Sequence, residues 1–169
     1  MTNVPPLKMI DPDAGDSTID ARLAALGITL PNAAAPVAAY VPAVEYNGLL
    51  HISGQVSQRD GTIITGRVDE DRTLDFATDA ARTCGLMLLA QIKAALGSLD
   101  RVERVVKINV FVNSDPKFTG QPKVANGVSE LMVAVFGDAG KHARAAVGVA
   151  ALPLGALVEA DAIVAIKPA

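Results

Sequence analysis

An arginine among small apolar residues is the first group in this sequence that could do chemistry. Arg144 lies in the segment HARAAVGVA, residues 142–150. A buried charge without a partner is costly, so a strand arginine of this kind needs one. Its planar guanidinium suits a carboxylate held by two hydrogen bonds. Two interpretations are open: the carboxylate belongs to a ligand, or Arg144 forms a structural salt bridge with Glu159, Asp161 or another acid.

An acid in the last apolar segment is the second such group. Glu159 lies among Leu, Val, Ala and Ile residues, and Asp161 shares its face if alternate side chains point the same way. A carboxyl group there could orient a water molecule or hold a proton. The alternative is that both acids simply face solvent from an edge strand.

Three other residues have both a functional and a structural interpretation. Gly54, in Ser53-Gly54-Gln55, would let the backbone approach a ligand closely, although a bulge or corner is the commoner use of such a glycine. Cys84 falls on the apolar stripe of a predicted helix, which favours a core residue over a nucleophile. His51 alternates with apolar neighbours and is interpreted as a core or interface histidine.

A hairpin must position the first of these residues. Residues 40–46 and 49–55 read as strands, and Asn47-Gly48 between them is a strong signal for a type I′ turn. The polar residues 58–72 predict a loop with one brief strand.

Two helices and three more strands follow. Apolar residues recur every three or four positions over 73–96, and Gly97 supplies the end. A second helix is predicted within 119–136, where Gly127 is a weak position that costs about 1 kcal/mol relative to alanine. The predicted strands are 104–112, 142–150 and 156–166.

This order of elements predicts an α+β sandwich with the helices on one face of the sheet. The other face still carries apolar residues, which is typical of a sheet that is covered in an oligomer. Residues 1–35 predict an N-terminal arm with a short helix that starts near Ser17 and ends at Gly27. The main domain is predicted at 36–169.

Composition excludes several classes of function. The chain has 169 residues, a net charge of −3, one cysteine and two histidines. One cysteine excludes a disulfide framework and a cysteine zinc cluster, and two histidines argue against a His-rich metal site. The charge offers no basic field for nucleic acid. Because the sequence has neither a membrane-length apolar run nor a signal-peptide core, we expect a soluble cytoplasmic protein without membrane partners.

A set of motifs in this chain resembles a known family. The motifs are residues 36–40, Ile52-Ser53-Gly54-Gln55, Val110-Phe111-Val112, Val124-Ala125-Asn126, Ala143-Arg144, the run VAALP at 149–153 and the run VEADAI at 158–163. Their combination, over residues 36–167, resembles the YjgF/YER057c/UK114 group, also called the Rid (reactive intermediate deaminase) family. The longer N-terminus is similar to that of a chorismate-mutase-like branch.

The resemblance implies a chorismate-mutase-like β-β-α-β-α-β-β fold with a mixed sheet, assembled as a homotrimer with a cleft at each subunit interface. Deaminase members hydrolyse 2-imino acids to 2-oxo acids and ammonia without a metal or organic cofactor. The implied partner is therefore a small 2-imino or 2-oxo acid. Arg144 matches the arginine that pairs with the substrate carboxylate, and Glu159 matches the acid that helps to place the attacking water. Tyr40, Gly54 and Asn126 match positions that line the cleft.

The chain departs from the family pattern in four places. Ala145 and Ala146 follow Arg144, where deaminase members usually have Ser or Thr and then often Cys. The backbone carbonyl of Ala146 could still hold the water. Segments 56–72 and 118–126 are longer than in the shorter deaminases, and Asp161 stands where a second Glu is usual.

Three other functions compete with the deaminase interpretation. A trimer of the same fold could bind small carboxylates without turnover. A ribonuclease, suggested by older family names, fits poorly with an acidic chain that lacks clusters of aromatic and basic residues. A chorismate mutase would need several cations around a dicarboxylate, whereas the sequence offers one good candidate arginine.

Overall fold

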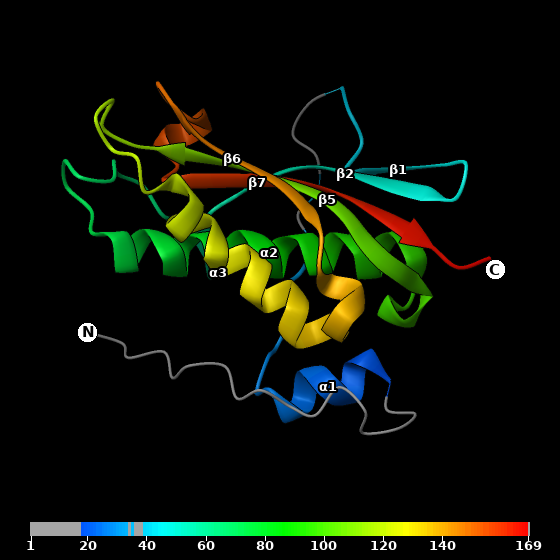
Figure 1. Ribbon diagram of the computed structural model, residues 1–169. Coiled ribbons are helices and arrows are strands. Elements are labelled where there is room, and N and C mark those ends of the chain that lie inside the picture. The colour runs from blue at the N-terminus through cyan, green and yellow to red at the C-terminus, as the bar shows by residue number, and fades with distance from the viewer. Residues whose placement is uncertain (1–17, 34, 36–38, 169) are drawn as a thin grey trace.

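A five-stranded sheet with helices on one side forms the body of the protein (Figure 1). This computed structural model describes residues 18–33, 35 and 39–168. The sheet has the order β1-β2-β7-β5-β6. Its strands are β1 (Ala43–Tyr46), β2 (Leu49–Val56), β5 (Val102–Asn113), β6 (Ala143–Val149) and β7 (Val158–Ile166). The helices are α1 (Ile19–Ala25), α2 (Leu74–Leu96) and α3 (Gln121–Phe136), with single 3-10 turns η1 (Leu99–Arg101), η2 (Gly137–Gly140) and η3 (Pro153–Gly155). The predicted α+β architecture is confirmed.

The sheet is mixed because one connection is a helical crossover. β1, β2, β7 and β5 pair antiparallel, whereas β5 and β6 run parallel. Parallel neighbours need a long connection, and α3 supplies it between β5 and β6. The crossover places α3 beside β6 at one edge of the sheet.

Two tight hairpins shape the first half of the chain. Asn47 and Gly48 both have positive φ, as the predicted type I′ turn between β1 and β2 requires. The region 58–72 contains a second hairpin, β3 (Gln58–Arg59) and β4 (Thr62–Ile63), rather than the one brief strand predicted. Its turn is Asp60-Gly61, also at positive φ. The same type of turn signal was therefore present in the sequence.

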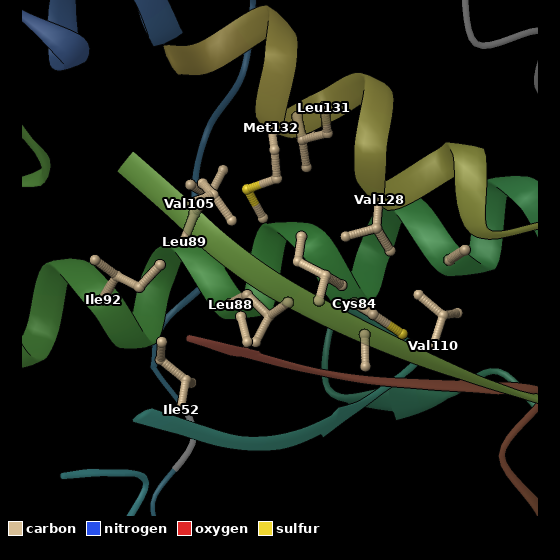
Figure 2. Packing of buried hydrophobic residues seen from close by; sticks show 14 of the residues in the cluster. Ile52, Cys84, Leu88, Leu89, Ile92, Val105, Val110, Val128, Leu131 and Met132 are labelled. Atoms are coloured by element: carbon tan, nitrogen blue, oxygen red, sulfur yellow. The ribbon is translucent and has the colours of Figure 1, made fainter. Parts of the chain in front are cut away.

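The core lies between the sheet and the two long helices. Figure 2 shows side chains from α2, α3 and β5 gathered there, among them Cys84, Leu88, Ile92, Val105, Val110, Val128, Leu131 and Met132. Cys84 is fully buried, its thiol lies 3.5 Å from the Val158 carbonyl oxygen, and burial raises the pKa of the thiol. The interpretation of Cys84 as a core residue is confirmed.

The short first helix docks under α3 (Figure 1). Thr18 caps it by accepting a hydrogen bond from the Ala21 N–H, and Leu23 is buried in the main core. Lys93 of α2 forms an ion pair with Asp20 at 2.8 Å. The cap predicted at Ser17, the rest of the arm at 1–17 and the motif residues 36–38 lie outside the described residues.

The other face of the sheet, here called the open face, carries no helix in the part of the chain that the structure describes (Figure 1). Several apolar side chains on it are half-buried or exposed: Val44, Tyr46, Leu49, Phe111, Val147 and Ile163. His51 is exposed on this face and pairs with Ile163, so it is not a core residue of this chain. An apolar sheet face of this kind is suited to burial against another protein surface.

Gly127 is a contact point between the helices rather than a weak position. A side-chain carbon added there would collide with the Thr78 carbonyl oxygen and the Arg82 N–H of α2. Helix propensity alone predicts that alanine at position 127 would stabilise the protein. The structure reverses this expectation, because the absence of a side chain lets α2 and α3 pack closely.

We therefore predict that Gly127→Ala destabilises the protein, although alanine is the better helix former. Overpacking against rigid backbone costs about 1–3 kcal/mol. Urea denaturation monitored by circular dichroism measures the change. Lys123→Ala, at an exposed position of α3, is the control and should unfold at close to the parental urea concentration. A Gly127→Ala protein more stable than its parent would contradict the packing explanation.

Candidate functional site

Arg144 projects from the edge strand β6 onto α3. Its Nη1 donates to Asn126 Oδ1 and to Ser129 Oγ, each at 3.0 Å, and its Nη2 donates to the Pro122 carbonyl oxygen at 3.2 Å. The strand register also places Arg144 on the helical face of the sheet, since it pairs with Ile108, a buried residue of β5 that faces the helices. The structure therefore brings two predicted site residues, Arg144 and Asn126, into direct contact.

No acidic side chain neutralises Arg144 among the residues that the structure describes. Its three hydrogen-bond acceptors are all uncharged. Asp161 instead accepts a hydrogen bond from Asn109 Nδ2 at 2.8 Å, and Glu159 lies on the opposite face of the sheet. The alternative of a structural salt bridge with these two acids is wrong within this chain. The positive charge of a half-buried guanidinium that contacts only neutral groups is not balanced within the chain, so it can attract an anionic ligand.

Ser129 and His142 extend the hydrogen bonds around Arg144. Ser129 Oγ lies 3.0 Å from His142 Nε2, and His142 Nδ1 lies 2.7 Å from the Gly140 carbonyl oxygen. A carbonyl oxygen only accepts, so Nδ1 carries the ring hydrogen and Nε2 accepts from the serine hydroxyl. Burial lowers the pKa of His142, the hydrogen bond to Gly140 opposes this effect, and the charge of Arg144 lowers the pKa further. The net pKa lies below the ordinary value, so the neutral ring predominates at pH 7.

Neither residue is among the predicted site residues, although their spacing in the sequence indicates both. Ser129 follows Asn126 by three positions on α3, which puts both on one helix face. His142 precedes Arg144 by two positions, which puts both on one side of an extended segment.

Glu159 occupies the middle of the open face. Its strand, β7, lies between β2 and β5, so the alternative that placed it on an edge strand is wrong. Glu159 pairs with Val56 on one side and Phe111 on the other. Its carboxyl group has no hydrogen bond or ion pair within the described residues. Burial raises its pKa, and the charge of Asp161 raises it further.

Gly54 leaves the space that the Glu159 carboxyl group fills. The register of β2 against β7 shifts between Ile52 and Gln55, which is the bulge proposed for this glycine. A side-chain carbon at Gly54 would collide with Glu159 Oε1. Ser53 Oγ donates to the Val41 carbonyl oxygen at 2.8 Å, which holds the segment of Tyr40 beside this strand. Tyr40 itself is 49% exposed.

The six predicted site residues thus form two groups. The β6–α3 group is Arg144, Asn126 and Ala146, and the β2–β7 group is Tyr40, Gly54 and Glu159. Ala146 is half-buried and pairs with Val110, on the same face as Arg144. Arg144 and Glu159 are two strands apart, or roughly 10 Å across the sheet, and three residues or roughly 10 Å apart along it. They also point to opposite faces, so one chain does not bring the two groups together.

Other features of the described residues do not join these groups. A hollow of about 590 Å³ lies between α2, the β3–β4 hairpin and residues 29–31, and its lining includes Arg59 and Arg82 but none of the six predicted residues. Within the described ranges, no three His, Cys, Asp or Glu side chains are grouped to hold a metal ion. No described helix is both long and apolar enough to cross a membrane.

The burial of the His142 ring predicts a pH dependence of stability. The unfolded chain binds a proton near the ordinary histidine pKa of about 6.5, while the folded chain resists protonation until lower pH. The stability that neutral His142 contributes is therefore present above pH ~6.5 and is lost as pH falls through the lowered pKa of the folded state.

We predict that the melting-temperature advantage of the parent over His142→Gln shrinks between pH 7.5 and 5. Glutamine keeps a donor and an acceptor but does not titrate. Thermal unfolding across this range measures the gap, and ring NMR signals of His142 report its titration directly. A constant gap, or a His142 ring that titrates above the ordinary range, would contradict this assignment.

Comparisons with known proteins agree with this fold. Residues 20–164 match the family model described as "YjgF/chorismate mutase-like, putative endoribonuclease". Protein TCP17 of Trypanosoma cruzi is 53% identical over 148 residues, which cover 86% of this chain and 92% of that protein. A 2-iminobutanoate/2-iminopropanoate deaminase of Dermatophagoides farinae is 28% identical over 142 residues, or 83% of this chain and 95% of the relative.

A solved structure is similar over most of its length. The protein Atu1372 of Agrobacterium tumefaciens superposes with a TM-score of 0.82 at 47% identity, covering 89% of this chain and 94% of the other. The family match spans residues 20–164, and the TM-score shows that the solved structure shares the fold. The chain belongs to the YjgF/chorismate mutase-like family, also known as the Rid or YjgF/UK114 family.

Proposed function

We propose that this protein hydrolyses small 2-imino acids to 2-oxo acids and ammonia. The observation that carries the proposal is the Arg144 guanidinium, which is half-buried on β6 and contacts only neutral acceptors among the described residues. A cation held in this way is suited to a ligand carboxylate. The similarity to a 2-iminobutanoate/2-iminopropanoate deaminase supports the choice of substrate class.

Arg144 retains the donors that a carboxylate needs. A guanidinium has five N–H groups, and three hydrogen bonds to protein acceptors leave one N–H on Nε and one on Nη2. Two such donors can hold both oxygens of a carboxylate. The α-carboxylate of a 2-imino acid is then fixed, and its C2 atom is placed at a constant distance from the arginine.

Glu159 is proposed to handle the proton of the attacking water. A carboxyl group with a raised pKa exchanges protons more readily near neutrality. The water oxygen bonds to C2 of the protonated imine, the C=N electron pair moves onto nitrogen, and Glu159 takes a water proton. The carbinolamine nitrogen then takes that proton from Glu159, and the C–N bond breaks with its electron pair on the departing ammonia. The hydroxyl oxygen forms the C=O bond of the 2-oxo acid as its proton passes to Glu159 and then to solvent. Proximity and orientation do most of the work, because an imine carbon is already electrophilic.

A homotrimer is proposed to bring the two groups of residues together. The β6–α3 group lies at one edge of the sheet, whereas Gly54 and Glu159 lie on the inner strands β2 and β7, with Glu159 on the open face. In this arrangement, Arg144, Asn126 and Ala146 of one subunit face Tyr40, Gly54 and Glu159 of the next. The apolar open face would be buried in the same contact, which supplies a driving force for assembly.

A non-catalytic carboxylate-binding trimer is the second candidate. Ala145 and Ala146 give the strand after Arg144 no side-chain hydrogen-bond donors. Such a cleft retains the arginine that binds the carboxylate but has fewer side-chain hydrogen bonds available to the reacting imine group. Turnover separates the two candidates.

The test generates 2-imino acids in situ with an amino-acid oxidase and follows their loss with and without this protein. We predict faster loss with the parent and a roughly thirtyfold to thousandfold lower rate with Arg144→Lys, because an ammonium lacks the planar fork worth about 2–4 kcal/mol here. Arg59→Lys, at an exposed ion pair with Asp79, is the matched control and should keep the parental rate.

Light scattering and melting temperatures of the same samples complete the test. The parent and Arg144→Lys should both have about three times the 17.4 kDa chain mass. A folded Arg144→Lys trimer that hydrolyses imines at the parental rate would exclude the proposed role of Arg144. A parent that binds 2-oxo acids but does not accelerate imine loss would favour the non-catalytic candidate.

A further inference from the structure

We propose that Ser129 and His142 are positioning residues that hold the Arg144 guanidinium ready for a carboxylate. The inference rests on the role of Arg144 in the proposed function and adds the groups that fix its orientation. Ser129 Oγ accepts from Arg144 Nη1 at 3.0 Å and lies 3.0 Å from His142 Nε2, while His142 Nδ1 lies 2.7 Å from the Gly140 carbonyl oxygen. The chain of contacts thus runs from the guanidinium to the backbone of η2.

Every donor in this chain of contacts has an acceptor. The Gly140 carbonyl fixes the ring hydrogen on Nδ1, which leaves Nε2 to accept the Ser129 hydroxyl hydrogen. The Ser129 oxygen then presents its lone pairs to Arg144. Because the hydroxyl hydrogen is committed to His142, it does not point at the cation. The serine oxygen is therefore always an acceptor for Arg144. A hydroxyl that rotated freely would at times point its hydrogen at the guanidinium.

One helix, α3, supplies all three acceptors of the guanidinium, and His142 ties that helix to η2. Pro122, Asn126 and Ser129 come from successive turns of α3, and His142 links the start of β6 to η2. An arginine side chain loses rotamer freedom when it binds a ligand, so one that is already fixed binds with less loss of entropy. The Asn126 and Ser129 oxygens both act on Nη1 and the Pro122 carbonyl acts on Nη2, which leaves the Nε hydrogen and one Nη2 hydrogen for an anion.

A second interpretation of the same geometry is a Ser–His nucleophile pair. The distance between Ser129 Oγ and His142 Nε2 fits such a pair. Two features oppose it. Arg144 donates to the serine oxygen and withdraws its lone pair from attack, and no carboxylate within the described residues orients His142 or supports its cationic form. The positioning role uses all the contacts, and the nucleophile role conflicts with one of them.

The test measures binding of pyruvate, as a simple 2-oxo acid probe, and the kinetics of imine hydrolysis in matched variants. Ser129→Ala removes the acceptor, and Ser129→Thr keeps a hydroxyl. His142→Leu removes the ring acceptor, and His142→Gln keeps a hydrogen-bonding side chain. Lys123→Ala, elsewhere on α3, is the control. Circular dichroism checks that each variant is folded, and Ser129→Cys replaces Ser129→Ala if the latter unfolds.

We expect Ser129→Ala to weaken pyruvate binding by at least roughly tenfold, since it removes a hydrogen bond to a charged group. KM for the imine should rise by a similar factor while kcat changes little, because the carboxylate is bound equally strongly in the substrate complex and in the transition state. Ser129→Thr and His142→Gln should recover most of the affinity. His142→Leu should fall between the parent and Ser129→Ala.

Several results would overturn the inference. These are parental affinity in a folded Ser129→Ala protein, a loss in kcat alone, covalent labelling of Ser129 by a fluorophosphonate, or a parent that does not bind pyruvate at all. Failure of the proposed function looks different: pyruvate binding that depends on Ser129 without any imine hydrolysis would retain the positioning role and exclude the deaminase.

Discussion

The arrangement of this protein depends on two helices covering only one face of a five-stranded sheet. α2 and α3 fill that face with apolar side chains and pack closely through Gly127. The opposite face is left with Val44, Leu49, Phe111 and Ile163, which are poorly suited to water. Burial of such a face in an assembly is favourable at roughly 25 cal/mol per Å² of apolar surface. The same division of the sheet decides where each polar group of the candidate site can lie.

Arg144 and Glu159 lie on opposite faces of the sheet, so they do not form an ion pair within one chain. Arg144 sits on the helical side of an edge strand, where only neutral oxygens of α3 reach it. Glu159 sits on the open side of a central strand, where burial raises its pKa. A cation and an acid that do not neutralise each other within one chain remain available to a ligand. A subunit boundary is the natural place for them to meet, and this is why the proposed function requires an assembly.

Much of the fold could be predicted from the sequence because its signals are local. Asn47-Gly48 specifies a turn, and the apolar spacing of 73–96 specifies a helix with Gly97 at its end. The β3–β4 hairpin had an equally local signal, Asp60-Gly61, which the polar composition of the surrounding loop obscured. The role of Gly127 could not be predicted in this way, because helix propensity is a property of one helix and the contact belongs to two.

The candidate site was harder to predict than the fold because its geometry is set by strand order. Alternation along 142–150 and 156–166 says that Arg144 and Glu159 each share a face with the residues two positions away in their own strand, but not whether they share a face with each other. Only the order β2-β7-β5-β6 shows that Glu159 is central and Arg144 peripheral. The contacts of Ser129 with Arg144 and His142 depend on the same crossover, since α3 reaches β6 only when β6 runs parallel to β5.

Complementation between two inactive variants is the decisive test of a site shared between subunits. Arg144→Ala and Glu159→Gln each lose one side of the proposed interfacial site. After subunit exchange in an equal mixture, about a quarter of the interfaces in random trimers would pair an intact Arg144 with an intact Glu159. If the site lies between subunits, imine hydrolysis, absent from each variant alone, returns to about a quarter of the parental rate. A fully exchanged mixture that stays as inactive as its components would show that the two residues do not act together across a subunit boundary.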